Sequence, residues 1–409
     1  MVNEMNETKK PAVRFKGFSD EWEQHPMDEL TAELHEYATL DSSYPLLTSS
    51  REGIMFQNEY RSNQTTENSK TLFSIVPYGK CTYRHMSDDD IFHFNINDIV
   101  ENGLVSREYP VFDSTDGNDL RFIVTLLNSS ARFRKFCRER KIGGTRTRLY
   151  YKDLSNFKPL CPEFDEQQSI AAFLDGITSI ISQHQSKLEK LQSLKASMLE
   201  KMFPKNDADV PEVRFNGFVE KWSTIELAQI ADKVNTKNVQ NDVTETFTNS
   251  AEHGIISQRD FFDHDISKAE KINGYYIVEN DDFVYNPRIS VTAPCGPINC
   301  NRLGRTGVMS PLYTVFRTHD IDTLFLEWYF KSSHWYAYMR FNGDSGARSD
   351  RFSIKSDLFF KMPIPIPSME EQFKIGQALQ TLNENIKLNL QELDKLQSIK
   401  KALLEKMFV

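Results

Sequence analysis

The chain carries the same motifs twice in the same order, and this internal repeat limits the fold more than any other feature of the sequence. The repeated anchors are VRFKGF at 13–18 and VRFNGF at 213–218, the tryptophans Trp22 and Trp222, EQ at 166–167 and 371–372, and LEKMF at 199–203 and 404–408. Anchors in one order over the whole length predict a tandem duplication of one module. They do not fit a solenoid, which stacks many short repeats.

Between the anchors the two halves have diverged, but short motifs still align. GxxSxxY begins at Gly103 and at Gly307, and GxR begins at Gly144 and at Gly346. Apolar runs bounded by Gly, Asn and Asp predict short strands, and longer periodic runs predict helices. The predicted strands are 71–76, 275–278 and 312–316, and the predicted helices are 119–137 and 323–338. Each half is therefore expected to contain a mixed α/β body.

A periodic tail without proline ends each half. Apolar residues recur there in alternating steps of four and three, the pattern of a helix that packs along one seam against another helix. A tail of about 38 residues would form a helix roughly 57 Å long. The central seam positions are Ile177, Ile181, His184 and Leu188 in the first tail, and Leu382, Ile386, Asn389 and Leu393 in the second. We predict an antiparallel pair in which His184 and Asn389 meet in the middle.

The fold class predicted from these patterns is α+β, with two similar mixed α/β domains separated by two long helices that form an antiparallel coiled coil. Proline-bearing connectors introduce both tails, because the residue before a proline favours extended backbone. The predicted boundaries are 1–162 for the first domain, 163–203 for the first long helix, 204–212 for a linker, 213–367 for the second domain and 368–409 for the second long helix.

Composition narrows the classes of protein. A chain of 409 residues can form two or three domains, each with its own core. No apolar run approaches the roughly 18 residues that cross a bilayer, so we expect a cytoplasmic protein with no membrane partner. Five cysteines at unrelated spacings favour reduced, buried thiols over a zinc site. The net charge of −9 argues mildly against nucleic-acid binding, but the clustering of charge matters more than its sum.

The sequence contains no recognisable catalytic motif, and we predict neither an enzyme nor a bound metal. Residues 78–81 (YGKC) lack the leading glycine and the hydroxyl of a phosphate-binding loop. Residues 286–288 (NPR) lack the second proline and the aromatic ring of an amino-methylation loop, and they are interpreted as a turn. The acidic run 88–90 (DDD) is expected to be an exposed loop, and the histidines form no HExxH-type pair.

Basic residues cluster near the GxR motif of each half. Bare glycine N–H groups, hydroxyls and guanidinium groups suit contacts to phosphates and bidentate contacts to guanine. The candidate DNA contacts at these two loops are Arg134, Arg138, Lys141, Gly144, Thr145, Arg146 and Arg148 in the first half, and Gly346, Arg348 and Arg351 in the second. Two such loops at matching positions favour one role used twice. The alternative is a solvated helix face followed by a flexible turn.

Further DNA-contact candidates come from short polar segments that align between the halves. They are Thr48, Ser49 and Arg84 in the first half, and Asn249, Ser250 and Arg288 in the second. Short polar side chains in loops are mostly turn formers. A role in the backbone turn therefore stays open beside a role in base contact.

The repeated VRFxGFxxxW starts, the Pro-rich lead into EQ and the KLQS…LEKMF helix ends resemble the specificity subunits of type I restriction–modification systems. The resemblance covers nearly the whole chain and includes the order of its repeats. It implies two target-recognition domains, each reading one half of a bipartite target in double-stranded DNA. It also implies long helices that act as a spacer and dock two methyltransferase subunits, with motor-nuclease subunits joining for restriction. S-adenosylmethionine, ATP and magnesium then belong to those partners, and this chain holds no cofactor.

Two other functions stay open at this point. The main rival is a scaffold that uses its coiled coil to assemble other proteins without reading DNA. A methyltransferase or nuclease fused to a helical hairpin is a more distant alternative. Salt-dependent binding of a duplex in the presence of a methyltransferase separates a DNA reader from a scaffold.

Overall fold

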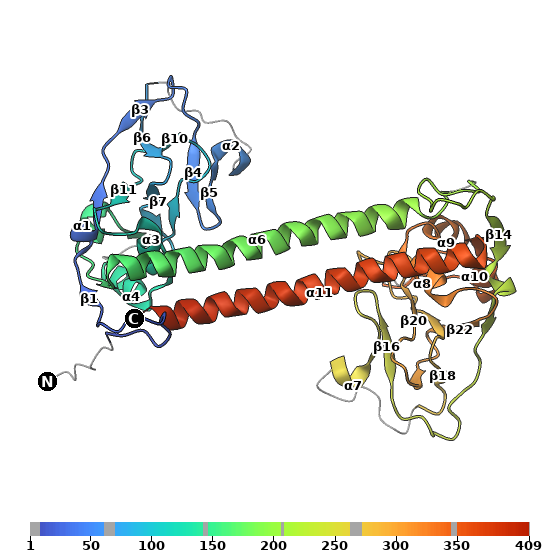
Figure 1. Ribbon diagram of the computed structural model, residues 1–409. Helices are drawn as coiled ribbons and strands as arrows, with labels where there is room; N and C mark the ends of the chain where they lie inside the picture. Colours follow the sequence, from blue (N-terminus) through green and yellow to red (C-terminus); the bar gives the residue numbers. More distant parts are fainter. Residues whose placement is uncertain are drawn as a thin grey trace. The chain divides into compact units, whose positions relative to one another are not determined.

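The computed structural model of the protein describes residues 9–60, 70–141, 146–205, 208–261, 272–344 and 350–408 (Figure 1). The chain divides into two compact units: unit 1 is Met1–His184 with Glu392–Val409, and unit 2 is Gln185–Gln391. Each unit holds one mixed α/β body and one end of both long helices, α6 (Phe164–Lys201) and α11 (Met369–Met407). Within the described ranges, no helix combines the length and the apolar character that crossing a membrane requires.

Unit 1 is built on a four-stranded antiparallel sheet of order β2-β11-β7-β9 and a three-stranded sheet of order β10-β6-β3, with β4 and β5 as a separate hairpin. Its elements are β1 (Glu23–Gln24), α1 (Met27–Leu30), β2 (Thr31–Glu33), β3 (Tyr37–Thr39), β4 (Leu47–Ser50), β5 (Gly53–Phe56), α2 (Gln57–Tyr60), β6 (Leu72–Pro77), β7 (Cys81–Tyr83), β8 (Met86–Ser87), β9 (Phe94–Ile96), β10 (Asn102–Ser106), β11 (Val111–Ser114), α3 (Leu120–Ser129), α4 (Ala131–Glu139), β12 (Thr147–Arg148), α5 (Tyr151–Leu154) and β13 (Leu160–Cys161). Its main core gathers Trp22, Phe94, Phe112 and Phe122 with apolar residues of both long helices.

Unit 2 repeats this plan. Its four-stranded antiparallel sheet has the order β15-β22-β19-β20, and β16 with β17 forms the separate hairpin. Its elements are β14 (Ser223–Glu226), η1 (Leu227–Gln229), β15 (Ala231–Lys233), β16 (Phe247–Ser250), β17 (Gly254–Ser257), α7 (Gln258–Phe261), β18 (Tyr276–Val278), β19 (Phe283–Tyr285), β20 (Ile298–Cys300), β21 (Gly307–Met309), β22 (Thr314–Thr318), α8 (Thr323–Lys331), α9 (Tyr336–Asn342), α10 (Ser356–Phe360) and β23 (Pro363–Ile366). The repeated sequence motifs therefore correspond to a repeated sheet topology.

The predicted strands agree with β6, β18 and β22 to within a few residues. The prediction of one continuous helix over 119–137 is wrong, because Ser130 divides it into α3 and α4. Ser130 has extended backbone (φ −66°, ψ 121°), and its hydroxyl accepts a hydrogen bond from Phe133 N, which caps the second helix. The single helix predicted over 323–338 is wrong for a similar reason, since α8 ends at Lys331 and the next residue, Ser332, also has extended backbone.

The repeated Arg of the VRFxGF motif is bound to the repeated Glu at the start of each long helix. In unit 1, Arg14 donates from Nε and Nη2 to the two carboxylate oxygens of Glu166, both at 2.6 Å. In unit 2, Arg214 binds Glu371 in the same way at 2.7 and 2.8 Å. Both glutamate side chains are 1% exposed, so these are buried, bidentate pairs. The pair ties the start of each repeat to its long helix.

The repeated Gln beside that Glu joins three segments. Gln167 Oε1 accepts a hydrogen bond from Asp119 N, the N-cap of α3, and its amide donates to Pro162 O in the connector. Gln372 makes the equivalent bonds to Asp322 N and Pro367 O in unit 2. Because the amide is a donor and an acceptor at once, Gln can satisfy two buried backbone groups that Glu could not. The EQ motif is thus a structural joint.

One ion pair occurs at the same place in both units with its charges exchanged. In unit 1, Lys80, next to β7, pairs with Asp113 of β11. In unit 2, the equivalent positions hold Asp282, next to β19, and Arg317 of β22, at 2.7 Å between Arg317 Nε and Asp282 Oδ1. The exchange keeps the attraction while it reverses both signs, which is expected of two copies that diverged under one structural constraint.

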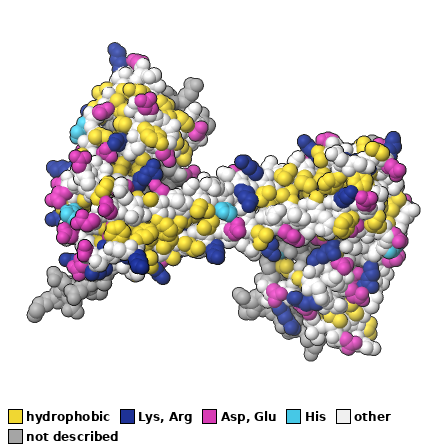
Figure 2. All heavy atoms as spheres, viewed as in Figure 1, with side chains coloured by type: hydrophobic (Ala, Val, Ile, Leu, Met, Phe, Trp, Pro, Cys, Tyr) yellow, Lys and Arg dark blue, Asp and Glu magenta, His cyan; other side chains and the backbone are white. Residues whose placement is uncertain are grey.

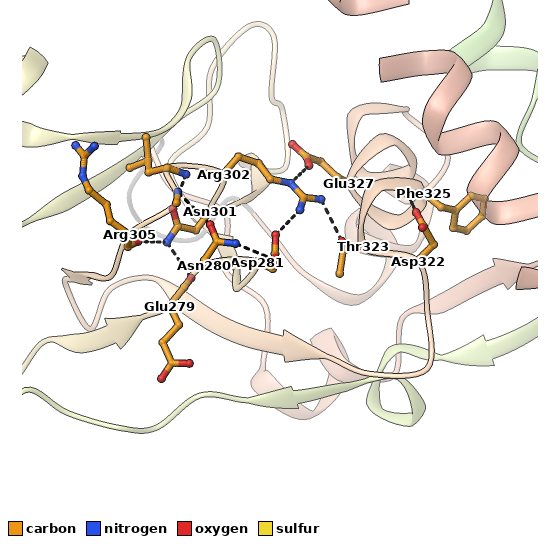
Figure 3. A network of polar contacts seen from close by, with 12 residues as sticks. Glu279, Asn280, Asp281, Asn301, Arg302, Arg305, Asp322, Thr323, Phe325 and Glu327 are labelled. Carbon is orange, nitrogen blue, oxygen red and sulfur yellow. Dashed lines mark hydrogen bonds and ion pairs between the residues drawn. The ribbon is translucent and has the colours of Figure 1, made fainter. Parts of the chain in front are cut away.

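A polar network in unit 2 holds the N-terminal end of α8 against the turns beside the sheet (Figure 3). Arg302 binds Asp281 and Thr323, and its Nε donates to Glu327 of α8 at 2.9 Å. Asn301 is fully buried and donates to the backbone oxygens of Glu279 and Arg305. The Arg302 side chain is thus committed to the scaffold of unit 2.

The segments of α6 and α11 run antiparallel within each unit. In unit 1, Ile170 near the start of α6 shares the core with Met407 at the end of α11. Further along α6, His184 Nδ1 lies 3.6 Å from Oε2 of Glu392, which comes before Met407 in α11. In unit 2, Lys195 donates to Asn383 at 2.6 Å. The seam residues that are buried are Ile177, Ile181, Leu382, Ile386, Asn389 and Leu393, and those that are half-buried are His184 and Leu188. Since His184 and Asn389 belong to different units, their predicted contact stays a prediction.

Candidate nucleic-acid interface

In unit 1, the candidate basic residues meet at the loop that follows β7. The short strand β8 in this loop pairs with β12, with Ser87 opposite Thr147 and Met86 opposite Arg148. The pairing brings the segment after the first GxR motif beside the loop that begins at Arg84. Burial is the main cause of the lowered pKa of His85. The positive charges of Arg148 and Arg84 lower this pKa further.

The acidic run of the same loop binds the neighbouring cations one by one. Asp88 Oδ1 accepts from Arg146 Nε at 2.7 Å, and Asp89 Oδ2 accepts from Arg51 Nη2 at 2.7 Å. Asp90 lies 3.3 Å from Lys141 Nζ and also accepts from the Thr147 hydroxyl. The prediction of an acidic loop was incomplete in one respect: its carboxylates are ion-paired partners of the basic surface.

Helix α4 adds cations to the same surface. Its buried face consists of Phe133 and Cys137, which leaves Arg134 and Arg138 exposed. The Thr147 hydrogen bond is the main reason for the lowered pKa of Asp90, and Lys141 and Arg138 lower it further. Burial lowers the pKa of His93, and the charges of Arg51 and Arg134 contribute to the same shift. Cations from α4, β12 and the β4–β5 turn therefore surround one loop.

A cavity of about 430 Å³ in unit 1 is lined by residues from the segments 48–52, 84–93 and 106–109. The predicted residues Thr48, Ser49 and Arg84 line it. His85 closes one wall: its side chain is 2% exposed, and its Nε2 lies 3.2 Å from Glu108 Oε2. The imidazole stacks on Tyr150 with 5.2 Å between ring centroids. The cavity is a feature of the candidate interface that sequence patterns could not indicate.

Ser49 and Asn249 have a structural task that the sequence alignment did not reveal. Both are buried, and each is bound by an asparagine of the main sheet: Asn95 donates to Ser49 Oγ at 2.8 Å, and Asn299 donates to Asn249 Oδ1. Asn249 itself donates to Val284 O at 2.6 Å. These side chains anchor the β4–β5 and β16–β17 hairpins and face the protein interior. The neighbours Thr48 and Ser250 are half-buried.

In unit 2, Arg288 and Arg351 occupy the place of β8 and β12. The two residues form an isolated antiparallel bridge, and Phe352 N donates to Pro287 O at 2.7 Å. Arg288 is exposed, and Arg351 Nε lies 4.0 Å from Asp350 Oδ2. The loop that follows carries Ser, Val and Thr at 290–292, where unit 1 carries its aspartates. The second unit thus repeats the basic position without the acidic run.

Four of the predicted site residues lie outside the described residues. They are Gly144, Thr145, Gly346 and Arg348. The predicted equivalence of Arg146 and Arg348 therefore stays a prediction, and the comparison of the two units rests on Arg148 and Arg351. Among the residues that are described, no group of three or more His, Cys, Asp or Glu side chains could hold a metal ion, and the cysteines are buried and free.

Arg51 is the cation of this surface that sequence reasoning missed. It stands alone in its segment, in the turn between β4 and β5, outside the dense basic runs of the sequence. A weak signal was present in the repeat itself: the acidic run of the first half aligns with SVT in the second. Because only the first copy of this loop carries the carboxylates, a cationic partner for them is expected in the first half, and Arg51 is one such partner.

No family model matches the sequence. Two curated proteins of Methanocaldococcus jannaschii do resemble it. The chain is 22% identical over 269 residues to the putative type I restriction enzyme MjaX specificity subunit, across 61% of this chain and 58% of that protein. It is 20% identical over 274 residues to the type I restriction enzyme MjaVIII specificity subunit, across 62% and 61%. The matches thus span about three fifths of the length of these relatives.

The fold has a counterpart among solved structures. The crystal structure of the type I restriction–modification system S subunit from M. genitalium aligns with a TM-score of 0.59 and 14% identity, and the alignment covers 98% of this chain and 99% of that one. At this identity the likeness concerns the fold alone, and the fold agrees in being a mixture of helices and strands. In sequence, therefore, this chain resembles the specificity subunits of type I restriction enzymes, as its repeated motifs indicated, and in fold it resembles a solved S subunit.

Proposed function

We propose that this chain is a non-catalytic subunit that reads a bipartite target in double-stranded DNA, one half with each body. The observation that carries the proposal is the repeated basic position, formed by β8 with β12 in unit 1 and by the bridge of Arg288 with Arg351 in unit 2. Two diverged copies of one α/β body suit the reading of two different half-sites. Arginine suits both tasks at such a site, because it binds phosphate oxygens and makes bidentate contacts to guanine.

The long helices would dock two methyltransferase subunits and separate the half-sites as an antiparallel coiled coil. Apolar side chains are exposed along them, and several of these can be followed on the face drawn in Figure 2. The exposed apolar residues of the helices are Phe164, Phe173, Ile180 and Leu194 on α6, and Met369, Phe373, Leu388, Leu390 and Ile399 on α11. Where such side chains form a contiguous patch, they favour a protein partner. S-adenosylmethionine, ATP, magnesium and the motor-nuclease activity would then be supplied by the partner subunits.

The test is selection of bound duplexes from a randomised library by the full chain assembled with its methyltransferase partner. We expect two short conserved blocks separated by a spacer of unspecified bases. Arg146→Ala should weaken the preference within one block, and Arg351→Ala within the other, each by about 1–3 kcal/mol if the side chain reads a base. Duplex binding without any enriched block would leave only a scaffold function for the chain.

A further inference from the structure

The three aspartates at 88–90 hold three different cations, and the contacts fall into two kinds. Asp90 is 18% exposed in its side chain, accepts from Thr147 of β12 and has left-handed backbone (φ 63°), so it anchors the loop to the strand. Asp88 and Asp89 are more exposed, at 62% and 40%, and each binds one arginine that is itself exposed. Asp90 therefore fixes the loop, and Asp88 and Asp89 face outward with an arginine each.

The loop is internally braced for this task. The Ser87 hydroxyl donates to Asp89 Oδ1 at 2.8 Å and accepts from Ile91 N at 3.1 Å. This Ser87 hydrogen bond is the main cause of the lowered pKa of Asp89. Because its backbone is held at both ends, the loop presents Asp88 and Asp89 at defined positions.

The Asp88 carboxylate binds Arg146 at a nitrogen that is not needed for an end-on bidentate contact to guanine. Asp88 binds the Nε of Arg146, and the fork that contacts guanine O6 and N7 consists of other guanidinium nitrogens. A carboxylate at Nε removes rotational freedom from a long side chain without occupying that fork. Holding the side chain in place before binding reduces the entropy that the specific complex has to lose.

The same carboxylates lower the attraction of unit 1 for DNA of any sequence. Each cation that neutralises a phosphate contributes about −0.9 to the slope of log K against log salt concentration. A cation that is already paired to an aspartate contributes less in a complex held by phosphates alone. Residues 290–292 of unit 2 contain no acid, so the equivalent loop of the second half lacks these carboxylates.

We propose that Asp88 is a specificity-determining positioning residue, which holds Arg146 ready to contact a base, and that Asp88 and Asp89 together cancel part of the charge of Arg146 and Arg51 toward arbitrary phosphates. This inference rests on the proposed DNA-reading function. It deepens that function by assigning a discriminating role to two acidic residues at a basic surface.

The test compares Asp88→Asn with the wild-type chain, both assembled with the methyltransferase partner. We expect about a tenfold loss of affinity for the target duplex, since a well-placed bidentate contact discriminates by about one to two powers of ten. We also expect tighter binding of a scrambled duplex, with a salt slope steeper by about one. Library selection should show a relaxed base preference in one block only, and Arg146→Ala should relax the same position.

Three matched variants complete the design. Asp88→Glu should restore part of the preference, and Asp89→Asn should steepen the salt slope on the scrambled duplex without relaxing the position that Arg146 reads. The control Glu23→Gln makes the same change of charge in unit 1 at a side chain that is 82% exposed, and it should leave the base preference unchanged. If Asp88→Asn bound the target and the scrambled duplex more tightly by the same factor and kept the base preference, the inference would be overturned. If the wild-type complex enriched no motif at all, the proposed function itself would fail, and the two failures are thus distinguishable.

Discussion

Breaking the buried pair of Arg14 with Glu166 should be among the most destabilising single changes in unit 1. Arg14→Met keeps most of the apolar length of the side chain but leaves the carboxylate of Glu166, 1% exposed, without the two donors that lie at 2.6 Å. Removing one partner of a buried ion pair costs about 3–5 kcal/mol, because the remaining charge is desolvated and unpaired. We therefore expect a loss of that size in the free energy of unfolding.

The double variant Arg14→Met/Glu166→Gln tests the cause. Removing the orphaned charge as well should recover part of the loss, which gives a coupling energy of about 2 kcal/mol between neighbouring sites. Arg214→Met offers a replicate in unit 2, where Glu371 is equally buried. Arg121→Met is the matched control, because its pair with Asp175 has the same 2.6 Å separation at a side chain that is 57% exposed. Exposed pairs contribute about 0–1 kcal/mol.

Urea unfolding, with hydrogen exchange resolved for each unit, measures these effects separately. The loss from Arg14→Met should appear in unit 1 and that from Arg214→Met in unit 2. If Arg14→Met costs no more than Arg121→Met, burial does not determine the strength of the pair, and the explanation given for the repeated Arg and Glu is wrong.

Three further outcomes follow from the packing of the two units. Gly103→Ala and Gly307→Ala should each lower the free energy of unfolding by about 1–3 kcal/mol. A Cβ at residue 103 would lie 2.1 Å from Leu47 Cδ1, and a Cβ at residue 307 would lie 2.4 Å from the Phe247 ring. Gly274→Ala, where nothing lies within 4 Å of the added Cβ, is the control in urea unfolding. Lys80→Asp should destabilise unit 1, and adding Asp113→Arg should restore its urea midpoint, because unit 2 already uses the reversed charges. Burial lowers the pKa of His85 from 6.5, so the unfolded chain binds more protons at low pH; the stability of unit 1 should therefore fall as the pH drops below about 6.5, and His85→Gln should flatten that dependence between pH 7.5 and 5.5.

The repeat allowed much of the architecture to be predicted, because each anchor serves a structural joint. The EQ motif and the VRFxGF start recur because Gln167 and Arg14 tie segments that are distant in sequence to the long helix. The break at Ser130 could not be predicted from periodicity, since the apolar pattern continues across it and a single side-chain cap decides it. Local capping competes with helix propagation over a single residue, which periodic patterns do not resolve.

The candidate interface was less accessible to prediction than the fold. The pairing of β8 with β12 brings the residues of the candidate interface together. These two segments lie about 60 residues apart in the chain, and local sequence patterns do not indicate which distant segments pair. Ser49 and Asn249 were both predicted to be loop residues, yet they are buried hairpin anchors that bind Asn95 and Asn299. The acidic run looked like solvated loop because its cationic partners are remote in sequence.

Exchange of one body tests the two-reader account most directly. Residues 13–156 would be replaced by the equivalent segment of a relative with a different target, and the methylated sites of cells that carry the chimera and its methyltransferase would be mapped. The account predicts that one half of the recognised sequence changes to that of the donor, while the other half and its bases stay the same. Alteration of both halves, or of neither, would contradict the claim that each body reads its own half-site.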